Sequence, residues 1–311
     1  MGFPTAGRLF ICRTENHYGT GFITFVLRII LMAETATDNK KPKAQDKEMS
    51  FWEHLEELRW HLFRAVLVLF LLAIAAFIMR HFIFDQIILA PKRPDFITYK
   101  FLCQLGKFLH ADSLCLGDID LQIINISMAG QFTTHIYISI ITALVVAFPY
   151  VIWEIWSFVR PALLPKEKKY SRGAVFYSTV LFIIGMLFSY YLIVPLTVNF
   201  FATYQVSESV RNTITLNSYI STVVSVTLAT GLVFELPIFV FFLTKVGIIT
   251  PRFMKRNRKY VLILLLTIAA IITPPDIASQ ILVTIPLMGL YEISIMVSSH
   301  VMKKRPAEDT E

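Results

Sequence analysis

Ser50-Phe-Trp-Glu-His-Leu-Glu-Glu-Leu-Arg59 decides the fold, because it runs directly into an apolar segment that begins near Leu62. Its first serine is followed three residues later by Glu53, which is the spacing of a capping box at a helix start. The apolar side chains of this stretch share one helical face, and its glutamates lie mostly on the other. The pattern predicts an amphipathic helix in a membrane interface, with Trp52 and Trp60 as anchors and carboxylates facing water.

The composition of the whole chain is typical of an integral membrane protein. Of its 311 residues, 55% are hydrophobic and 16% are charged, whereas soluble domains contain about 25% charged residues. The mean hydropathy is +0.61. The net charge of +7 comes from basic residues that flank apolar segments and do not cluster on a soluble module, so we expect no nucleic-acid partner.

Six apolar runs predict an all-α integral membrane protein with six transmembrane helices. The predicted spans are 62–78, 129–153, 174–198, 216–243, 260–272 and 277–291. The last two are short, since as helices they reach roughly 20 Å against a hydrocarbon core of about 30 Å. A long polar and mixed segment, 80–128, separates the first two spans.

An even number of spans puts both termini on one side, and lysine and arginine determine which side that is. Basic residues gather before the first span, in the loops 153–172 and 245–259, and in the tail, and they are sparse in 199–216 and 273–276. We therefore expect both termini in the cytoplasm.

These spans divide the chain into three segments. We expect 1–48 to be an N-terminal extension that is disordered or reflects a misplaced start, because it holds no apolar run of spanning length. Residues 49–302 hold the six spans, and 303–311 form a cytoplasmic tail.

The cysteines do not form a CxxC pair, so no metal or Fe–S site is predicted. Cys103 and Cys115 both fall in 80–128, on the exported side, where a disulfide between them is possible and two free thiols are the alternative. The sequence holds no Walker A, HExxH, GxSxG or GxGxxG motif. We expect neither an enzyme nor a cofactor.

Two polar features fall within or beside the predicted spans. Glu235 lies inside the fourth, where a carboxyl costs several kcal/mol unless it is satisfied or protonated. It marks either a functional site or a hydrogen bond between helices near Pro237. Thr273-Pro-Pro-Asp276 predicts a sharp turn, and capping of the following helix is an adequate explanation of Asp276.

Two further carboxyls lie outside the predicted spans. Glu57, next to Glu56 and Arg59, can be explained as part of a solvated helix face. Glu167 lies in a lysine-rich loop, and the positive-inside rule accounts for the lysines but not for Glu167. The neighbouring cations favour its ionised form.

From about Met49 to Met302 the chain resembles the TatC component of the twin-arginine protein translocase. Four stretches carry the resemblance, and each stands at the expected loop or span: SFWEHLEELRWHLFRA, SFVRPALLPKEKK, FELP and TPPDIASQ. The resemblance implies a multi-pass protein of the plasma (inner) membrane with the shape of a cupped hand. It also implies a receptor for Arg-Arg signal peptides and a core subunit that exports folded proteins, driven by the proton gradient.

The resemblance also implies roles for particular residues. The residues implied in signal-peptide binding are Glu57, Glu167, Arg59, Phe158 and Pro161. The residues implied as membrane-embedded polar groups that dock partners are Glu235, Asp276 and Gln280. Those partners are single-span TatA-type subunits, with or without TatB-type subunits, in a hetero- and homo-oligomer within the lipid bilayer.

The chemistry of the ligand agrees with this assignment, because two guanidinium groups suit two carboxylates that accept bidentate hydrogen bonds, whereas lysine lacks the planar fork. Two alternatives stay open at this point. One is a proton-coupled secondary transporter that uses Glu235, and the other is a passive membrane anchor or assembly protein.

Overall fold

The computed structural model describes residues 51–93, 95–109, 122–159, 171–207, 213–273 and 277–303, which are almost entirely helical. The extension 1–48 and nearly all of the tail lie outside this described part. Five helical segments are long and apolar enough to cross a membrane. The prediction of an all-helical membrane protein is therefore confirmed. The predicted fifth span, 260–272, is not among these five segments, so the count of six spans stays a prediction.

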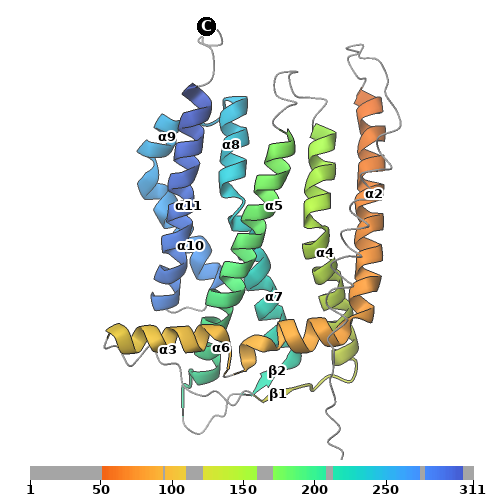
Figure 1. Cartoon of the computed structure of the whole chain (residues 1–311), viewed down its shortest axis with the longest axis vertical. Coiled ribbons are helices and arrows are strands. Elements are labelled where there is room, and N and C mark those ends of the chain that lie inside the picture. The colour runs from red at the N-terminus through yellow and green to blue at the C-terminus, as the bar shows by residue number, and fades with distance from the viewer. Residues whose placement is uncertain are drawn as a thin grey trace, which may run out of the picture. The chain divides into compact units, whose positions relative to one another are not determined.

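The long passes run side by side in alternating directions (Figure 1). In chain order the passes are α2 (Phe51–Ile78), α4 (Gly130–Val159), α5 (Ser171–Phe188) with η6 (Ser189–Ile193) and α6 (Val194–Thr203), α7 (Leu216–Val233) with α8 (Leu236–Val246), α10 (Arg258–Ile272) and α11 (Ile277–Lys303). The N-terminal end of α2, the short helix α9 (Pro251–Arg256) and the C-terminal end of α11 lie at the same end, at the top of Figure 1.

Several helices differ in length from the sequence prediction. The Ser50–Arg59 stretch does not form a separate interfacial helix, because from Phe51 onward it is continuous with the first span as α2. The second span continues past Trp153 to Val159. The last helix is not short, since α11 has 27 residues and ends at Lys303. Of the two helices predicted to be short, only α10, with 15 residues, is short.

Helix α11 continues past Tyr291 because the polar residues that follow have partners within the protein. Glu292 accepts a 2.7 Å hydrogen bond from Arg258. Ser294 donates to the carbonyl of Leu290, and Ser298 shares a 2.8 Å hydrogen bond with Thr244 of α8. Because these groups have partners inside the protein, they need not end a helix in an apolar environment.

The fourth pass is broken at Glu235. Pro237 has no N–H to donate to the carbonyl of Val233, so the α-helical ladder stops at the end of α7. Glu235 is the N-terminal flanking residue of α8, and its carbonyl accepts the first hydrogen bonds of that helix, from Ile238 and Phe239.

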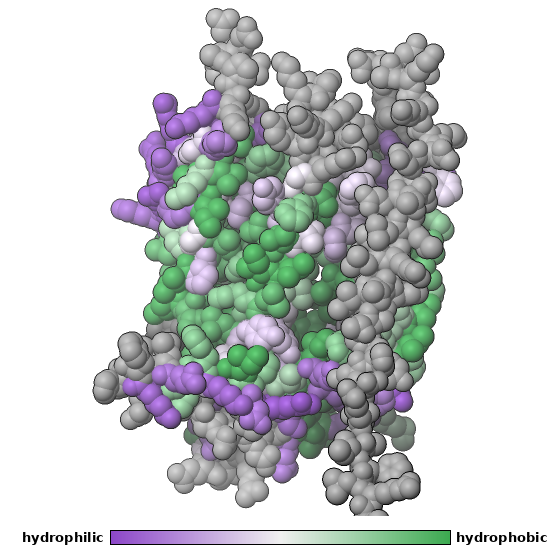
Figure 2. Space-filling view, in the orientation of Figure 1, coloured by the Kyte–Doolittle hydropathy of each residue, from purple (hydrophilic) through white to green (hydrophobic). Residues whose placement is uncertain are grey.

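The segment predicted as a long polar loop contains a layer of short helices at the other end of the bundle. It holds η1 (Phe82–Ile88), η2 (Ala90–Lys92) and α3 (Ile97–Leu109), and α3 lies across the ends of the long helices (Figure 1). Two-residue strands β1 (Ile123–Ile124) and β2 (Ile214–Thr215) pair in parallel there. Figure 2 shows the apolar surface of the bundle bounded by hydrophilic residues at both ends.

Tyrosines tie this layer to the long helices. Tyr190 donates to the carbonyl of Ile87 at 2.6 Å, and Tyr219 donates to that of Ile88 at 2.9 Å. Both carbonyls belong to the last turn of the π-helix η1, where the regular helical ladder ends. Tyr99 of α3 donates to the carbonyl of Pro91 at 2.9 Å, and burial raises its pKa to about 12.

Helix α7 occupies the centre of the core and packs against α4, α5 and α10. Its close approach to α5 depends on two glycines. A Cβ at Gly185 would lie 2.6 Å from Phe234, and one at Gly231 would lie 3.0 Å from Phe182. These are positions where the sequence has no side chain because the neighbouring aromatic ring fills the space.

We expect Gly185→Ala to lower stability by about 1–3 kcal/mol, because the added methyl group must displace Phe234. Gly289→Ala in α11 is the matched control, since nothing lies within 4 Å of its added Cβ, and helix propensity favours alanine by up to about 1 kcal/mol. Thermal unfolding of the purified protein in detergent, followed by circular dichroism, measures both. Equal midpoints for the two variants would contradict this packing.

Candidate functional site

The packing of α2 against α4 brings together side chains that are far apart in the sequence. Glu154, in the last turns of α4, is only 6% exposed. One of its oxygens accepts a hydrogen bond from Tyr150 at 2.6 Å, and the other contacts Nδ1 of His61 from α2. Both oxygens of this buried carboxyl therefore have partners, as its burial requires.

Glu57 lies on the other side of His61. Its Oε1 is 3.9 Å from Nε2 of His61, a distance too long for a hydrogen bond. Its Oε2 is buried and has no hydrogen-bond partner within the described part of the chain. The ring of Phe158 lies edge-on to that of His61, with 6.3 Å between centroids. Glu57, His61 and Phe158 are thus neighbours at one end of the α2–α4 pair.

The other residues predicted for this site are placed differently. Arg59 turns away from Glu57 and pairs with Glu56 at 3.5 Å, and both side chains are mostly exposed. Its guanidinium also lies over the ring of Trp60, 5.6 Å from the ring centroid. Glu167 and Pro161 lie outside the described residues, so their predicted place in this site stays a prediction.

His61, Tyr150 and Glu154 were missed in the sequence analysis. The predicted second span ended at Trp153, which put Glu154 outside the membrane. The signal was present, because Glu154 stands alone between apolar and aromatic residues. An isolated carboxyl in an apolar run was the reason for selecting Glu235, and the same rule selects Glu154 once the helix extends to Val159.

Glu235 occupies a second polar site, where α5 meets the break between α7 and α8. It is 4% exposed, and its Oε2 accepts a 2.7 Å hydrogen bond from Ser178 of α5. The other oxygen, Oε1, is buried and has no partner among the residues that the structure describes. The sequence left two explanations of Glu235 open, a functional site and a hydrogen bond between helices. The hydrogen bond is present, but it involves only Oε2.

The remaining predicted residues have local contacts. Gln280 donates to the carbonyl of Leu266 at 3.1 Å and so ties α11 to α10. Asp276 lies outside the described residues. Cys103 is disulfide-bonded, whereas Cys115 lies outside the described residues, so the pairing of these two cysteines stays a prediction. No group of three or more metal-ligating side chains occurs among the residues described.

These features define a polytopic, all-helical membrane protein in which Glu154 and Glu235 are the buried charged residues of the described chain. Residues 53–286 match the model of the family described as Sec-independent protein translocase protein (TatC). The chain therefore belongs to the TatC family, whose members are non-enzymatic membrane components of a protein translocase.

Individual relatives cover most of the chain. The Sec-independent protein translocase protein TatC of Blattabacterium sp. subsp. Periplaneta americana (strain BPLAN) is 41% identical over 85% of this chain and 100% of its own length. The TatCy protein of Bacillus subtilis (strain 168) is 33% identical over 83% of this chain and 91% of its own. The identification from the four sequence stretches is confirmed, and a secondary transporter is not favoured.

Solved structures have the same fold. A crystal structure described as the twin-arginine translocase receptor TatC has a TM-score of 0.58 at 28% identity, covering 80% of this chain and all of that one. A second, of the same receptor in the detergent DDM, has a TM-score of 0.61 at 29% identity, covering 79% of this chain and 99% of that one.

We expect Glu154→Ala to destabilise the protein, because His61 and Tyr150 both lose their partner in a buried position. The cost is about 1–3 kcal/mol for each orphaned group. Glu56→Ala is the control, because the pair with Arg59 is mostly exposed and such pairs contribute at most about 1 kcal/mol. Thermal unfolding in detergent measures the difference, and an equal drop in both variants would argue against a structural role for Glu154.

Proposed function

We propose that this chain is the receptor for signal peptides with paired arginines and the core subunit of a translocase that exports folded proteins. The observation that carries the proposal is the buried Oε2 of Glu57, which has no hydrogen-bond partner among the described residues. It lies at the helix end where two sequence stretches typical of the family meet. The description of two similar solved structures as twin-arginine translocase receptors supports it.

The proposed site holds one arginine of the peptide at Glu57 and the other at Glu167. A guanidinium presents two parallel N–H groups to a carboxylate, so it satisfies both oxygens at once. Oε2 of Glu57 is in need of such a donor, and His61 lies too far from Oε1 to compete with it. Phe158, whose ring lies edge-on to that of His61, supplies an apolar wall beside the first carboxylate. Pro161 belongs to the proposed site through the family stretch that contains it.

Arg59 has an indirect role in this proposal. It already occupies the neighbouring carboxylate, Glu56. Glu57, whose carboxyl is less accessible to water, is therefore the acceptor that remains for an arginine of the peptide. A contact to a partly buried carboxylate is worth more than one to a solvated carboxylate.

We propose that the end carrying Glu57 faces the cytoplasm and that the membrane is the inner membrane. Basic residues gather there on α9 and at the start of α10, at the end that also holds the N-terminal end of α2 and the C-terminal end of α11 (Figure 1). Short basic loops stay on the cytoplasmic side during insertion. Both termini and the signal-peptide site then face the compartment in which cargo is made.

Glu235 is the proposed docking point for single-span TatA-type or TatB-type subunits. Its Oε1, which has no partner in the part of the chain that the structure describes, belongs to a segment of spanning length, where an unsatisfied carboxyl oxygen is costly. A polar side chain or backbone donor from a partner helix would satisfy it. The proposed energy source is the transmembrane proton gradient.

Replacing either proposed acceptor should abolish recognition of the arginine pair. We expect Glu57→Gln and Glu167→Gln each to reduce photocrosslinking of an Arg-Arg signal peptide by about tenfold or more, because a charged hydrogen bond is lost. Membrane insertion should be unchanged. A peptide with Lys-Lys should crosslink to the unaltered protein as weakly as the Arg-Arg peptide does to the variants.

Glu56→Gln is the matched control, because it removes the same charge one residue away from Glu57. Its crosslinking should stay within about twofold of the unaltered protein, since the group is exposed. Undiminished crosslinking in both the Glu57 and Glu167 variants would refute the assignment of the site.

Replacing Glu235 should affect partners and leave peptide binding intact. We expect Glu235→Ala to lose most co-purification of a single-span partner subunit, because the polar group that would receive it is gone. Glu292→Ala is the control, since Glu292 is paired with Arg258 in another part of the bundle. Full co-purification with Glu235→Ala, or equal loss in both variants, would remove Glu235 from the docking site.

A further inference from the structure

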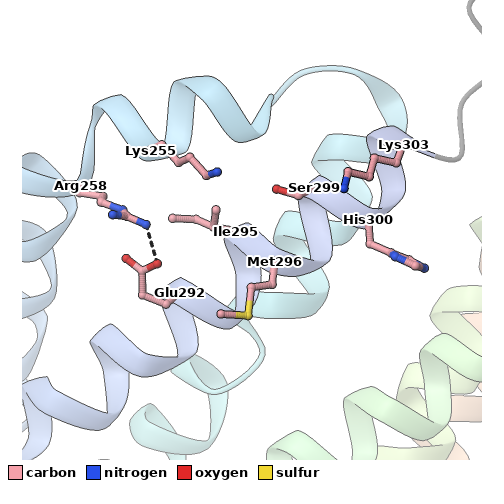
Figure 3. Close-up of a pocket in the computed structure, with 8 residues that line it drawn as sticks. All are labelled: Lys255, Arg258, Glu292, Ile295, Met296, Ser299, His300 and Lys303. Carbon is pink, nitrogen blue, oxygen red and sulfur yellow. Dashed lines mark hydrogen bonds and ion pairs between the residues drawn. The ribbon is translucent and has the colours of Figure 1, made fainter.

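A polar cavity of about 390 Å³ opens between α9, the start of α10 and the last turns of α11. It contains side chains of opposite character, with cations at its rim and apolar groups at its floor (Figure 3). Lys255 comes from α9, and Ser299 and Lys303 come from α11. None of the polar residues that line this cavity belongs to the sites described above.

The charges of this cavity do not cancel. Glu292 supplies its carboxylate, which is already paired with Arg258 at 2.7 Å. Lys255 and Lys303 remain, and neither forms an ion pair within the described chain. Their ammonium groups point into the same space from opposite sides, with the Ser299 hydroxyl between them, whereas His300 points away (Figure 3). The cavity therefore suits an anion that accepts hydrogen bonds from several directions.

The wall below the cations is apolar and faces outward. Met296 lines the cavity and is 68% exposed, and Ile293 on the preceding turn is 50% exposed. Both residues belong to the membrane-spanning segment Gln280–Lys303. An occupant therefore meets lysines at the end of this span and a hydrocarbon-like surface about two to three turns deeper. A free inorganic anion would use only the cationic half.

We propose that this cavity binds an anionic phospholipid, with its phosphate between Lys255 and Lys303 and one acyl chain along Met296. Ser299 is placed to donate to the same phosphate. A bound lipid would join α9 to α11, which are also linked by the hydrogen bond that Tyr291 donates to the carbonyl of Met254. The proposal is independent of which side of the membrane this end faces.

Native mass spectrometry of the full chain in detergent tests this inference directly. Phosphatidylglycerol, phosphatidylethanolamine and inorganic phosphate are titrated separately, and the lipid-bound fraction is counted. We expect tighter binding of phosphatidylglycerol than of phosphatidylethanolamine, and a weakening of roughly tenfold or more in the double variant Lys255→Gln/Lys303→Gln. Met296→Gln should weaken binding of the lipid, and inorganic phosphate should not displace the lipid.

Arg256→Gln/Lys259→Gln is the matched control, because it removes one cation from α9 and one from α10, and neither residue lines the cavity. This variant should bind the lipid as the unaltered protein does. Equal weakening in the two double variants would show a diffuse charge effect and overturn the site. Equal binding of the two lipids, or displacement by inorganic phosphate, would also overturn it. An unchanged thermal unfolding midpoint in the absence of added lipid verifies that each variant is folded.

Discussion

The structure depends on one constraint, which is that a polar group held away from water must find its partner within the protein. Three glutamates meet this constraint to different degrees. Glu154 is satisfied at both oxygens by His61 and Tyr150, Glu235 is satisfied at one oxygen by Ser178, and Glu57 keeps one buried oxygen without a partner in the described chain. The fully satisfied carboxyl holds α2 against α4. At Glu57 and Glu235, a hydrogen-bond donor from another molecule would contribute the most binding free energy, because the oxygen that it satisfies is already buried at a cost.

The same constraint explains the irregular backbone. A break such as that at Pro237 frees carbonyls in an apolar environment, and it persists because other groups of the protein compensate. Here the break turns Glu235 toward α5, where Ser178 donates to it. Where the π-helix η1 ends, Tyr190 and Tyr219 from two other helical segments donate to carbonyls of its last turn. Irregular segments thus occur where helices that are distant in the sequence supply donors.

Hydropathy predicts the spans because it depends on local composition, and the four family stretches predict the class of protein. What could not be predicted depends on contacts between distant residues. The extension of α11 past Tyr291 requires Arg258 to pair with Glu292, which lies 34 positions away. The contact between His61 and Glu154 joins residues 93 positions apart. Helix α3 was not predicted because its polar residues resemble those of a loop. Its stability depends on contacts with other segments, such as the hydrogen bonds from Tyr99 to the carbonyls of Pro91 and Pro195.

The short length of α10 accounts for the position of the cationic cavity beside it. With 15 residues, α10 reaches roughly 22 Å, less than a hydrocarbon core of about 30 Å. Its first residue, Arg258, therefore pairs not with the end of α11 but with Glu292, roughly 16 Å before Lys303 along that helix. The polar helix α9 therefore lies beside α11. Lys255 and Lys303 line the same cavity, next to the exposed Met296. In the proposed lipid site, the shortness of α10 is what places the basic residues of α9 at the phosphates and upper acyl chains of lipids.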